Sequence, residues 1–405
     1  MSSNEEGDAP PNTATQHKSG GRSAVVLSIL LVLVATILGG AAASWLSASP
    51  SASVHLTGAS AAASRAAGDA TTASLLAAAA APPANPVPSA PGSEVPARLH
   101  ESDPFLTVAD GRYLLTSSGG AGDSAINVPV VTSTDFIHWT APIDALPTLP
   151  AWAARGFTWA PDIHRFANSY ALYFTAQVKG SNPTMQCIGS AFGTSATGPY
   201  TARPDPFICQ LDQGGSIDPR VFVDSDGTPW VMFKSDQNIE GSPTPTKMWS
   251  QRLSADGTRL LGSPSFLMSP DRPWQGTIVE APQMVKVDGT YWVVYSANWY
   301  NNPRYGIGIA RCNGPAGPCA DESSVPFMGS NAQGPGPGEA SVFQTASGIW
   351  MLYTPRCSAA PYADVPPRPI YITRLGWTAQ GPYLASGNPP SASDLLSVPF
   401  WAPTN

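Results

Sequence analysis

Pairs of apolar runs joined by a turn signal recur along the chain. One pair lies in the stretch 279–295, which reads VEAPQMVKVDGTYWVVY. Its two halves flank Asp288-Gly289, a dipeptide that supplies the positive φ of a tight β-turn. This stretch therefore predicts a β-hairpin. Similar pairs surround four further aromatic residues, which are Tyr113, Tyr170, Trp230 and Trp350.

The spacing of these hairpins predicts the fold class. The aromatic residue after each turn is at position 113, 170, 230, 291 or 350, so successive copies are 57, 60, 61 and 59 residues apart. A repeat of this length that opens with a hairpin is typical of a β-propeller, in which each repeat is one blade. We therefore predict an all-β fold, a five-bladed β-propeller over 98–405. The repeated aromatics are expected to pack between blades.

The N-terminal part of the chain contains a candidate membrane segment. Residues 24–43 include no charged side chain, and Lys18 and Arg22 precede them. This length and the positive flank predict a transmembrane signal anchor over 24–46 with a cytoplasmic N-terminus. A cleaved signal peptide, with Ala41-Ala42-Ala43 as the cleavage site, is the alternative. Both place the remainder outside the cytoplasm, either on a single-pass membrane protein or in a secreted one.

The predicted organisation of the chain has four parts. The segment that follows the candidate anchor is rich in Ala, Ser and Pro and nearly free of aromatic residues, so it predicts a disordered stalk. The parts are a cytoplasmic tail (1–23), the anchor or signal peptide (24–46), the stalk (47–97) and the propeller (98–405).

Composition and cysteine usage narrow the class of protein. Charged residues make up 12% of the chain, against 43 Pro and 37 Gly, which fits a loop-rich extracellular β protein. The net charge of −7 without a basic cluster argues against nucleic acid as a partner, and we expect a monomer. No CxxC motif suggests zinc.

Five cysteines lie in the exported part, so at least one is unpaired. Cys312 and Cys319 flank a turn-rich loop and are expected to pair with each other. Cys187 would then pair with Cys209 and leave Cys357 single. The alternative, in which Cys357 pairs with Cys312 or Cys319, stays open.

Three repeats carry an acidic residue near the start of the first strand: Asp103, Asp218 and Glu280. First strands of propeller blades run along the central axis, so these residues are expected to meet at one end of the channel. Gathered carboxylates are costly unless one is protonated or each has a task. Glycoside hydrolysis has that requirement, since it uses one protonated and one ionised carboxyl.

The segments that open the repeats resemble glycoside hydrolase family 43. The similar motifs are Ser-Asp-Pro-Phe (102–105), Trp-Ala-Pro-Asp (159–162), Ser-Ile-Asp-Pro-Arg (216–220), Val-Glu-Ala-Pro (279–282), Gly-Pro-Gly (336–338) and the segment 368–377. The resemblance covers roughly 98–385. It implies a five-bladed propeller of the arabinosidase or xylosidase type, which acts on oligo- and polysaccharides with inversion and requires no cofactor.

The resemblance also implies a role for each acid. By position in the motifs, Asp103 matches the general base, Glu280 the general acid, and Asp218 the third acid that orients Glu280 and helps to keep it protonated. Inversion requires a water between base and acid. The carboxyls of Asp103 and Glu280 are therefore expected to lie roughly 6.5–9.5 Å apart.

Glu339 departs from the family pattern, because many members carry His after Gly-Pro-Gly, near a metal or a water in the channel. With this carboxylate, a structural Ca²⁺ near the channel and a changed sugar preference are both open possibilities. Asp162 is expected to bind backbone amides or to orient a neighbour.

The residues expected to contact the sugar are two aromatic side chains, an arginine and the acid that differs from the family pattern: Trp159, Trp299, Arg368 and Glu339. Packing between blades is an equal alternative for Trp159. Arg356 and Arg374 compete with Arg368 as the contacting arginine. Trp274 and Tyr300 flank the fourth hairpin together with Trp299 and are further candidates.

Two other functions fit the same fold. A fructan-cleaving hydrolase would retain configuration, but the Asn-Asp-Pro and Glu-Cys motifs expected of it are absent, since Ser102 precedes Asp103 and Ala281 follows Glu280. A membrane-tethered propeller that binds glycan or protein without cleavage is the second alternative. A shared pocket for Asp103, Asp218 and Glu280 would favour catalysis.

Overall fold

The computed structural model describes residues 92–396, except for gaps at 98, 100–101, 121–125, 168, 239–243 and 357–367. These residues belong to one compact unit of the chain, 73–405. The predicted tail, the anchor or signal peptide, and the stalk up to residue 91 lie outside the described residues. Within the part of the chain that the structure describes, no helix is long and apolar enough to cross a membrane.

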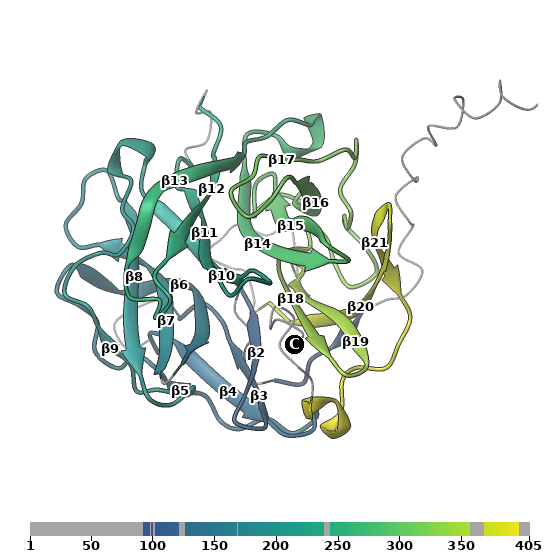
Figure 1. The fold of residues 1–405 in the computed structure, drawn as a ribbon, viewed down its shortest axis with the longest axis horizontal. Coiled ribbons are helices and arrows are strands. Elements are labelled where there is room, and N and C mark those ends of the chain that lie inside the picture. Colours follow the sequence, from purple (N-terminus) through teal and green to yellow (C-terminus); the bar gives the residue numbers. More distant parts are fainter. Residues whose placement is uncertain are drawn as a thin grey trace, which may run out of the picture. The chain divides into compact units, whose positions relative to one another are not determined.

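Five antiparallel sheets are arranged in a ring, as Figure 1 shows. Blade one contains β2 (Phe105–Ala109), β3 (Arg112–Thr116), β4 (Pro129–Ser133) and β5 (Ile143–Asp144). Blade two contains β6 (Ala153–Phe166), β7 (Ser169–Val178), β8 (Gln186–Gly193) and β9 (Thr201–Ala202). Blade three contains β10 (Ser216–Val223), β11 (Pro229–Ser235), β12 (Met248–Leu253) and β13 (Leu260–Met268).

The last two blades follow the same order. Blade four contains β14 (Val279–Val287), β15 (Thr290–Ala297), β16 (Gly306–Cys312) and β17 (Cys319–Ala320). Blade five contains β18 (Gly338–Thr345), β19 (Gly348–Thr354), β20 (Tyr371–Thr378), β21 (Gly381–Ala385) and the N-terminal strand β1 (Ser93–Glu94). Short 3₁₀ helices complete the described chain at η1 (Leu211–Gln213), η2 (Pro273–Gln275) and η4 (Ala392–Leu396). The prediction of a five-bladed propeller is confirmed.

The predicted hairpins form the two inner strands of each blade. In blade four, Val287 pairs with Thr290 across Asp288 and Gly289, whose φ angles are 48° and 77°. Two consecutive positive φ angles define the tight turn whose twist matches that of the flanking strands. Asp110 and Gly111 repeat this geometry in blade one, with φ angles of 51° and 70°.

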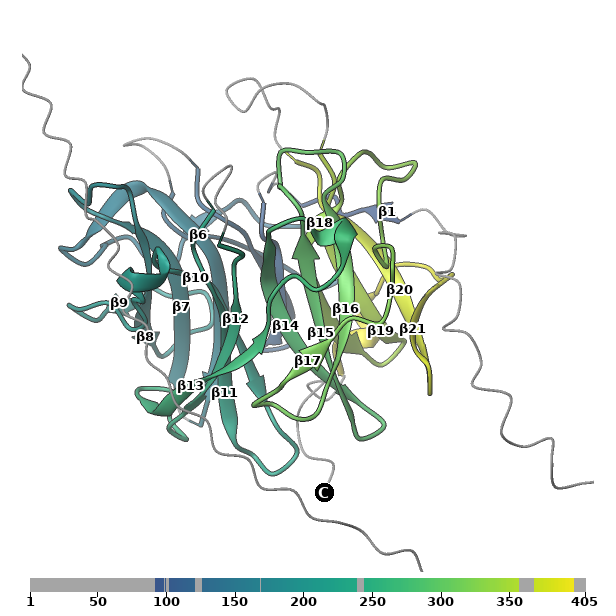
Figure 2. The same cartoon turned by 90° about the horizontal axis from the view of Figure 1, so that it is seen from above.

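The N-terminal strand closes the ring. The innermost strands β2, β6, β10, β14 and β18 contact one another in sequence, and β18 contacts β2. Strand β1 then pairs with β20, with Ser93 opposite Ile372 (Figure 2). Blade five therefore contains both the first and the last of the described strands, β1 and β21. Because β1 lies inside the range predicted as stalk, 47–97, the folded part begins before residue 98. Val95 and Ala97 are also buried, in the core cluster between blades one and five.

Polar side chains tie neighbouring blades together near the axis. Asp162 of β6 accepts a hydrogen bond from the Val221 backbone N–H of blade three at 3.1 Å, as predicted for this residue. Gln283 of β14 makes the corresponding link to blade five. Its Oε1 accepts from the Val342 N–H at 2.6 Å and its Nε2 donates to the Val342 carbonyl at 2.8 Å. These links satisfy buried backbone groups that no strand partner reaches.

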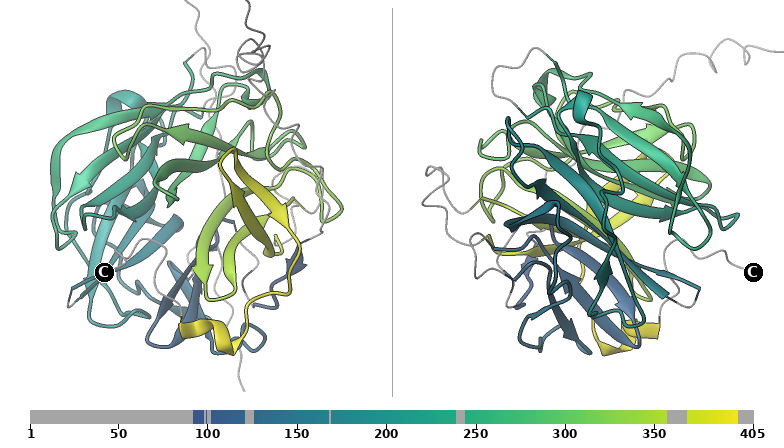
Figure 3. Two further views of the ribbon diagram at one scale, coloured as in Figure 1. Left: turned by 45° about the vertical axis from the view of Figure 1, so that its right-hand side comes forward. Right: turned by 90° about the vertical axis from the view of Figure 1, so that its left-hand side faces the viewer.

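Apolar side chains fill the spaces between adjacent sheets. Figure 3 shows the arrangement of these sheets from two further sides. Tyr113 is fully buried and meets Phe136 edge to face at 5.0 Å, and Phe136 stacks on Phe343 of blade five at 6.4 Å. Trp350 belongs to the same cluster. Trp230 and Tyr291 lie in the cluster of blades three and four. The predicted inter-blade role of these aromatics is confirmed.

Two disulfides have the predicted pairing. Cys187 bonds Cys209, which links β8 to the segment before η1, and Cys312 bonds Cys319 between β16 and β17. The sequence separations of the two pairs are 22 and 7. Cys357 lies outside the described residues.

We expect Gln283→Ala to lower the free energy of unfolding by about 2–3 kcal/mol, because it leaves the buried N–H and C=O of Val342 without their partner. Urea denaturation of the purified chain measures this change. Gln380→Ala is the matched control, since Gln380 is exposed in the turn between β20 and β21, and we expect a change within about 0.5 kcal/mol. Equal losses in both variants would contradict the proposed inter-blade link.

Candidate active site

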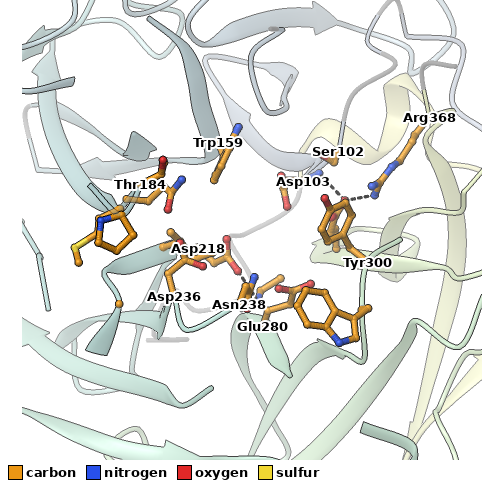
Figure 4. A pocket seen from close by; sticks show the side chains of 18 residues that line it. Ser102, Asp103, Trp159, Thr184, Asp218, Asp236, Asn238, Glu280, Tyr300 and Arg368 are labelled. Carbon is orange, nitrogen blue, oxygen red and sulfur yellow. Dashed lines mark hydrogen bonds and ion pairs between the residues drawn. The ribbon is translucent and has the colours of Figure 1, made fainter. Parts of the chain in front are cut away.

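A cavity of about 450 Å³ lies where the innermost strands of the five blades begin. Each blade contributes a residue from this region to its lining, namely Asp103, Trp159, Asp218, Glu280 and Glu339. Figure 4 shows the carboxyls of Asp103, Asp218 and Glu280 around the same space. The lining also includes Trp299 and Arg368, so the structure brings together all seven residues that the sequence predicts for the site.

A repeated backbone feature directs these side chains into the cavity. One non-glycine residue within or just before each innermost strand has a φ angle between 46° and 58°: Asp103, Ala160, Asp218, Ala281 and Glu339. In blades two to five the strand register shifts across this residue, which marks a β-bulge. The left-handed conformation is strained for a residue with a Cβ, and such strain concentrates at functional sites.

The bulge shows that the three predicted acids do not occupy equivalent positions. Asp103 and Asp218 are the left-handed residues of their blades, and Glu339 is the left-handed residue of blade five. Glu280 stands one residue earlier, at the position that Trp159 occupies in blade two. The acid of blade four therefore reaches the cavity from a different point of the repeat.

Asp103 is held by Ser118 of its own blade and by Glu339 of blade five. Ser118 Oγ donates to Asp103 Oδ2 at 2.5 Å and accepts from the Ala160 N–H of blade two at 3.0 Å. The backbone N–H of Asp103 donates to Glu339 Oε2 of blade five at 3.2 Å. These contacts fix both the side chain and the backbone of this residue.

Both oxygens of the Glu280 carboxyl have a partner. Lys234 Nζ lies 2.7 Å from Oε2, and Tyr305 donates its hydroxyl to Oε1 at 2.5 Å. The Lys234 side chain is 0% exposed and also donates to Asn238 Oδ1 at 2.8 Å. Asp236 lines the cavity beside Asn238.

Sequence analysis missed these partners of Glu280. Lys234 gave a usable signal, because it stands in the otherwise apolar strand β11, and a charge in a buried strand requires a counter-charge. Tyr305 gave no comparable signal. It precedes β16 in an irregular loop whose course the hairpin repeat does not define.

Asp218 is buried beneath the cavity and carries a strongly shifted pKa. Its Oδ2 accepts from the Ala281 N–H at 2.9 Å, and its own N–H donates to Thr175 Oγ1 at 3.1 Å. Burial raises the pKa of Asp218 to about 8, against the opposing effect of Lys234, and the charges of Asp103 and Glu280 raise it further. Asp218 therefore retains its proton to a higher pH than an ordinary aspartate does.

Glu339, the departure from the family pattern, forms an ion pair. Arg368 Nη1 lies 3.0 Å from its Oε2, and Thr354 Oγ1 donates to the same oxygen at 3.2 Å. Burial raises the pKa of Glu339 to about 7, although Arg368 acts in the opposite direction. Within the described residues, no group of three or more His, Cys, Asp or Glu side chains is arranged to hold a metal ion. The Ca²⁺ near the channel stays a prediction.

The aromatic candidates separate into lining and core residues. Trp299 and Tyr300 line the cavity, and Arg368 lies over the Tyr300 ring at 5.9 Å. Trp274 instead stacks on Tyr295 at 6.1 Å and packs against the core of blades three and four. Of the three candidate arginines, Arg368 lines the cavity.

A five-bladed ring with acids from several blades around one cavity of this size defines a propeller of the glycosidase class. A family model described as glycosyl hydrolases family 43 matches residues 96–383. The chain belongs to this family, as the motifs at the starts of the blades predicted.

Individual relatives are distant. The chain is 26% identical over 212 residues to an extracellular endo-α-(1→5)-L-arabinanase of Bacillus subtilis, which covers 49% of this chain and 61% of that protein. It is 27% identical over 150 residues to an extracellular exo-α-(1→5)-L-arabinofuranosidase of Cellvibrio japonicus, covering 33% and 40%. The chain therefore spans less than two thirds of these relatives. A solved thermostable family-43 glycoside hydrolase has a TM-score of 0.61 at 25% identity, covering 72% of this chain and 96% of that one.

The raised pKa of Asp218 predicts a dependence of stability on pH. Because the folded-state pKa of about 8 exceeds the ordinary value of 3.8, the folded protein holds a proton that the unfolded chain releases between these values. The free energy of unfolding should therefore fall as the pH rises through this range, by about 1.4 kcal/mol per pH unit from this group. Asp218→Asn should flatten this slope in urea denaturation at a series of pH values.

Asp226→Asn is the control for this experiment, because it removes the same charge from an exposed hairpin turn. The slope of this variant should match that of the wild type. An unchanged slope in Asp218→Asn would show that Asp218 is ionised in the folded protein throughout the range.

Proposed function

We propose that this chain is an inverting glycoside hydrolase that cleaves α-L-arabinofuranosyl or β-D-xylosyl linkages in oligo- or polysaccharides. The observation that carries the proposal is the convergence of Asp103, Asp218 and Glu280, from three blades, on one cavity. Acid–base cleavage of a glycosidic bond needs two carboxyls in different protonation states on opposite sides of the bond. The names of the relatives, an arabinanase and an arabinofuranosidase, support the choice of sugar.

In the proposed reaction, Asp103 removes a proton from the attacking water. Its carboxylate is suited to this task because Ser118 engages Oδ2 and Glu339 engages the backbone N–H, so the group is fixed before substrate binds. A general base contributes most when its orientation is set in advance. The water attacks the anomeric carbon from the face opposite the leaving group.

Glu280 then donates a proton to the departing glycosidic oxygen. Lys234 and Tyr305 orient its two oxygens, and Asp218 lies next to it on the blade-three side of the cavity. The raised pKa of Asp218 means that Asp218 itself retains a proton near neutral pH. Trp159 and Trp299 offer aromatic faces to the sugar, and Arg368 offers guanidinium donors.

Two features support action outside the cytoplasm. Both relatives described above are named as extracellular enzymes. The disulfides Cys187–Cys209 and Cys312–Cys319 fit an oxidising compartment.

Hydrolysis of 4-nitrophenyl α-L-arabinofuranoside, 4-nitrophenyl β-D-xyloside and arabino-oligosaccharides by the full chain tests the proposal. On a substrate that the wild type cleaves, Asp103→Asn and Glu280→Gln should each reduce kcat by about 10²–10⁴-fold, because each removes a proton-transfer group. Glu322→Gln, at an exposed loop position, should leave the rate unchanged. Full activity in either cavity variant would refute its assigned role. Binding of oligosaccharide without cleavage would favour the non-catalytic alternative.

The stereochemistry of the first product distinguishes the inverting mechanism from the retaining, fructan-type alternative. We expect ¹H NMR of the fresh reaction mixture to show the anomer opposite in configuration to the substrate, because a single displacement by water inverts the anomeric carbon. Initial formation of the anomer with the substrate's configuration would indicate a covalent intermediate. In that case Asp103 would be a nucleophile rather than a base.

A further inference from the structure

Lys234 is a buried ammonium whose position the fold itself does not require. It extends from β11, the second strand of blade three, to the carboxyl of Glu280 in blade four at 2.7 Å, and its side chain is 0% exposed. Burial of a lysine is costly unless its charge is paired. A methionine or leucine would complete the apolar strand at lower cost. The lysine is therefore better explained by what it does to Glu280.

We propose that Lys234 is a positioning residue for the reaction: it fixes the carboxyl of Glu280 toward the cavity and places a positive charge beside it. This inference rests on the proposed function, because it gives Lys234 a role that acts through the proposed general acid.

The positioning part follows from the contacts of Glu280. Lys234 engages Oε2 and Tyr305 engages Oε1, so the carboxyl is held at both oxygens. Each carboxyl oxygen has a second acceptor direction, which leaves room for a proton shared with the glycosidic oxygen. Without Lys234, the carboxyl would be held at one oxygen and would be free to rotate about its terminal torsion.

The charge part follows from the groups that face Glu280. They come from β10, from β11 and its following loop, from the loop before β16, and from β18, and they are Asp218, Lys234, Asp236, Tyr305 and Glu339. Lys234 is the cation of this set, and three of its members are carboxyls. Burial disfavours the charged form of Lys234, but the Glu280 and Asp218 carboxylates outweigh this effect and raise its pKa, so it remains an ammonium.

Removing the ammonium should therefore shift Glu280 toward its protonated form. An opposite charge at this distance shifts a carboxyl titration downward by about 1–3 pH units, and its loss reverses that shift. Lys234→Met removes the charge and approximately keeps the side-chain volume. Lys286→Met is the matched control, because Lys286 forms an ion pair of similar length with Asp224, 2.8 Å, near the turn ends of the blades and away from the cavity.

Carboxyl titration by NMR measures this effect without reference to catalysis. The sequence contains eight glutamates, so selective δ-¹³C labelling of the full chain gives few signals, and the signal missing from Glu280→Gln identifies Glu280. We expect its midpoint to rise by at least about one pH unit in Lys234→Met and to stay unchanged in Lys286→Met. An unchanged midpoint in Lys234→Met would overturn the proposal. If that variant does not fold, Lys234→Gln, which also removes the charge, carries the same expectation and the same refutation.

Leaving-group dependence tests the catalytic consequence. On a series of aryl glycosides that the wild type cleaves, Lys234→Met should lose about 10²-fold in kcat for a poor leaving group and much less for 2,4-dinitrophenolate, which departs without protonation. An equal loss across the series would show a structural role alone and overturn the proposal. If the wild type cleaves no glycoside, the proposed function fails, while the NMR titration still decides whether Lys234 controls Glu280.

Discussion

The site depends on the balance of charge in one small cavity. Five carboxyls line it, from Asp103, Asp218, Asp236, Glu280 and Glu339. Two cations compensate them: Lys234 pairs with Glu280, and Arg368 pairs with Glu339. Two charges cannot neutralise five in a partly desolvated space, so protons make up part of the difference. Burial raises the pKa values of Asp218 and Glu339, and the neighbouring carboxylates raise them further. The protons in the cavity therefore depend on all five carboxyls together.

The backbone that gathers these carboxyls is itself strained. A left-handed residue other than glycine occurs within or just before every innermost strand, and such a conformation costs of order 1–3 kcal/mol. It persists where the surrounding structure over-determines it. Here the constraints are the cross-blade bonds of Asp162 and Gln283 and the closure of the ring through β1 and β20. The pairing of β1 with β20, which closes the ring, therefore helps to hold the left-handed residues at the cavity. Ser93 and Glu94 do so although they are remote in sequence from the acids of blades three to five.

The sequence predicts what repeats and misses what does not. The period of about sixty residues gives the propeller, and the repeated motifs give Asp103, Asp218 and Glu280, because both arise from local patterns. The partners of Glu280 are 46 and 25 residues away in the sequence. At the register position of Lys234, blades two, four and five carry Thr175, Ser296 and Thr354 instead. Strand β1 has two residues and no apolar run, so no sequence pattern marks it as part of the propeller. The one-residue offset of Glu280 is present in the sequence as well, because Pro follows Asp103 and Asp218 directly but follows Ala281 in blade four.

Glu339 stands where the motif resemblance implies a histidine in many family members, and it contributes to how the proposed base is held. One oxygen of Glu339 accepts hydrogen bonds from the Asp103 N–H, from Thr354 and from Arg368. A neutral imidazole offers one acceptor nitrogen and cannot supply the charge that pairs with a guanidinium. Glu339 therefore links the backbone of the proposed base to the arginine of blade five, and this link is charge-dependent. The proposed base and the arginine of blade five are in this way joined through a single carboxylate, just as Lys234 joins blade three to the acid of blade four.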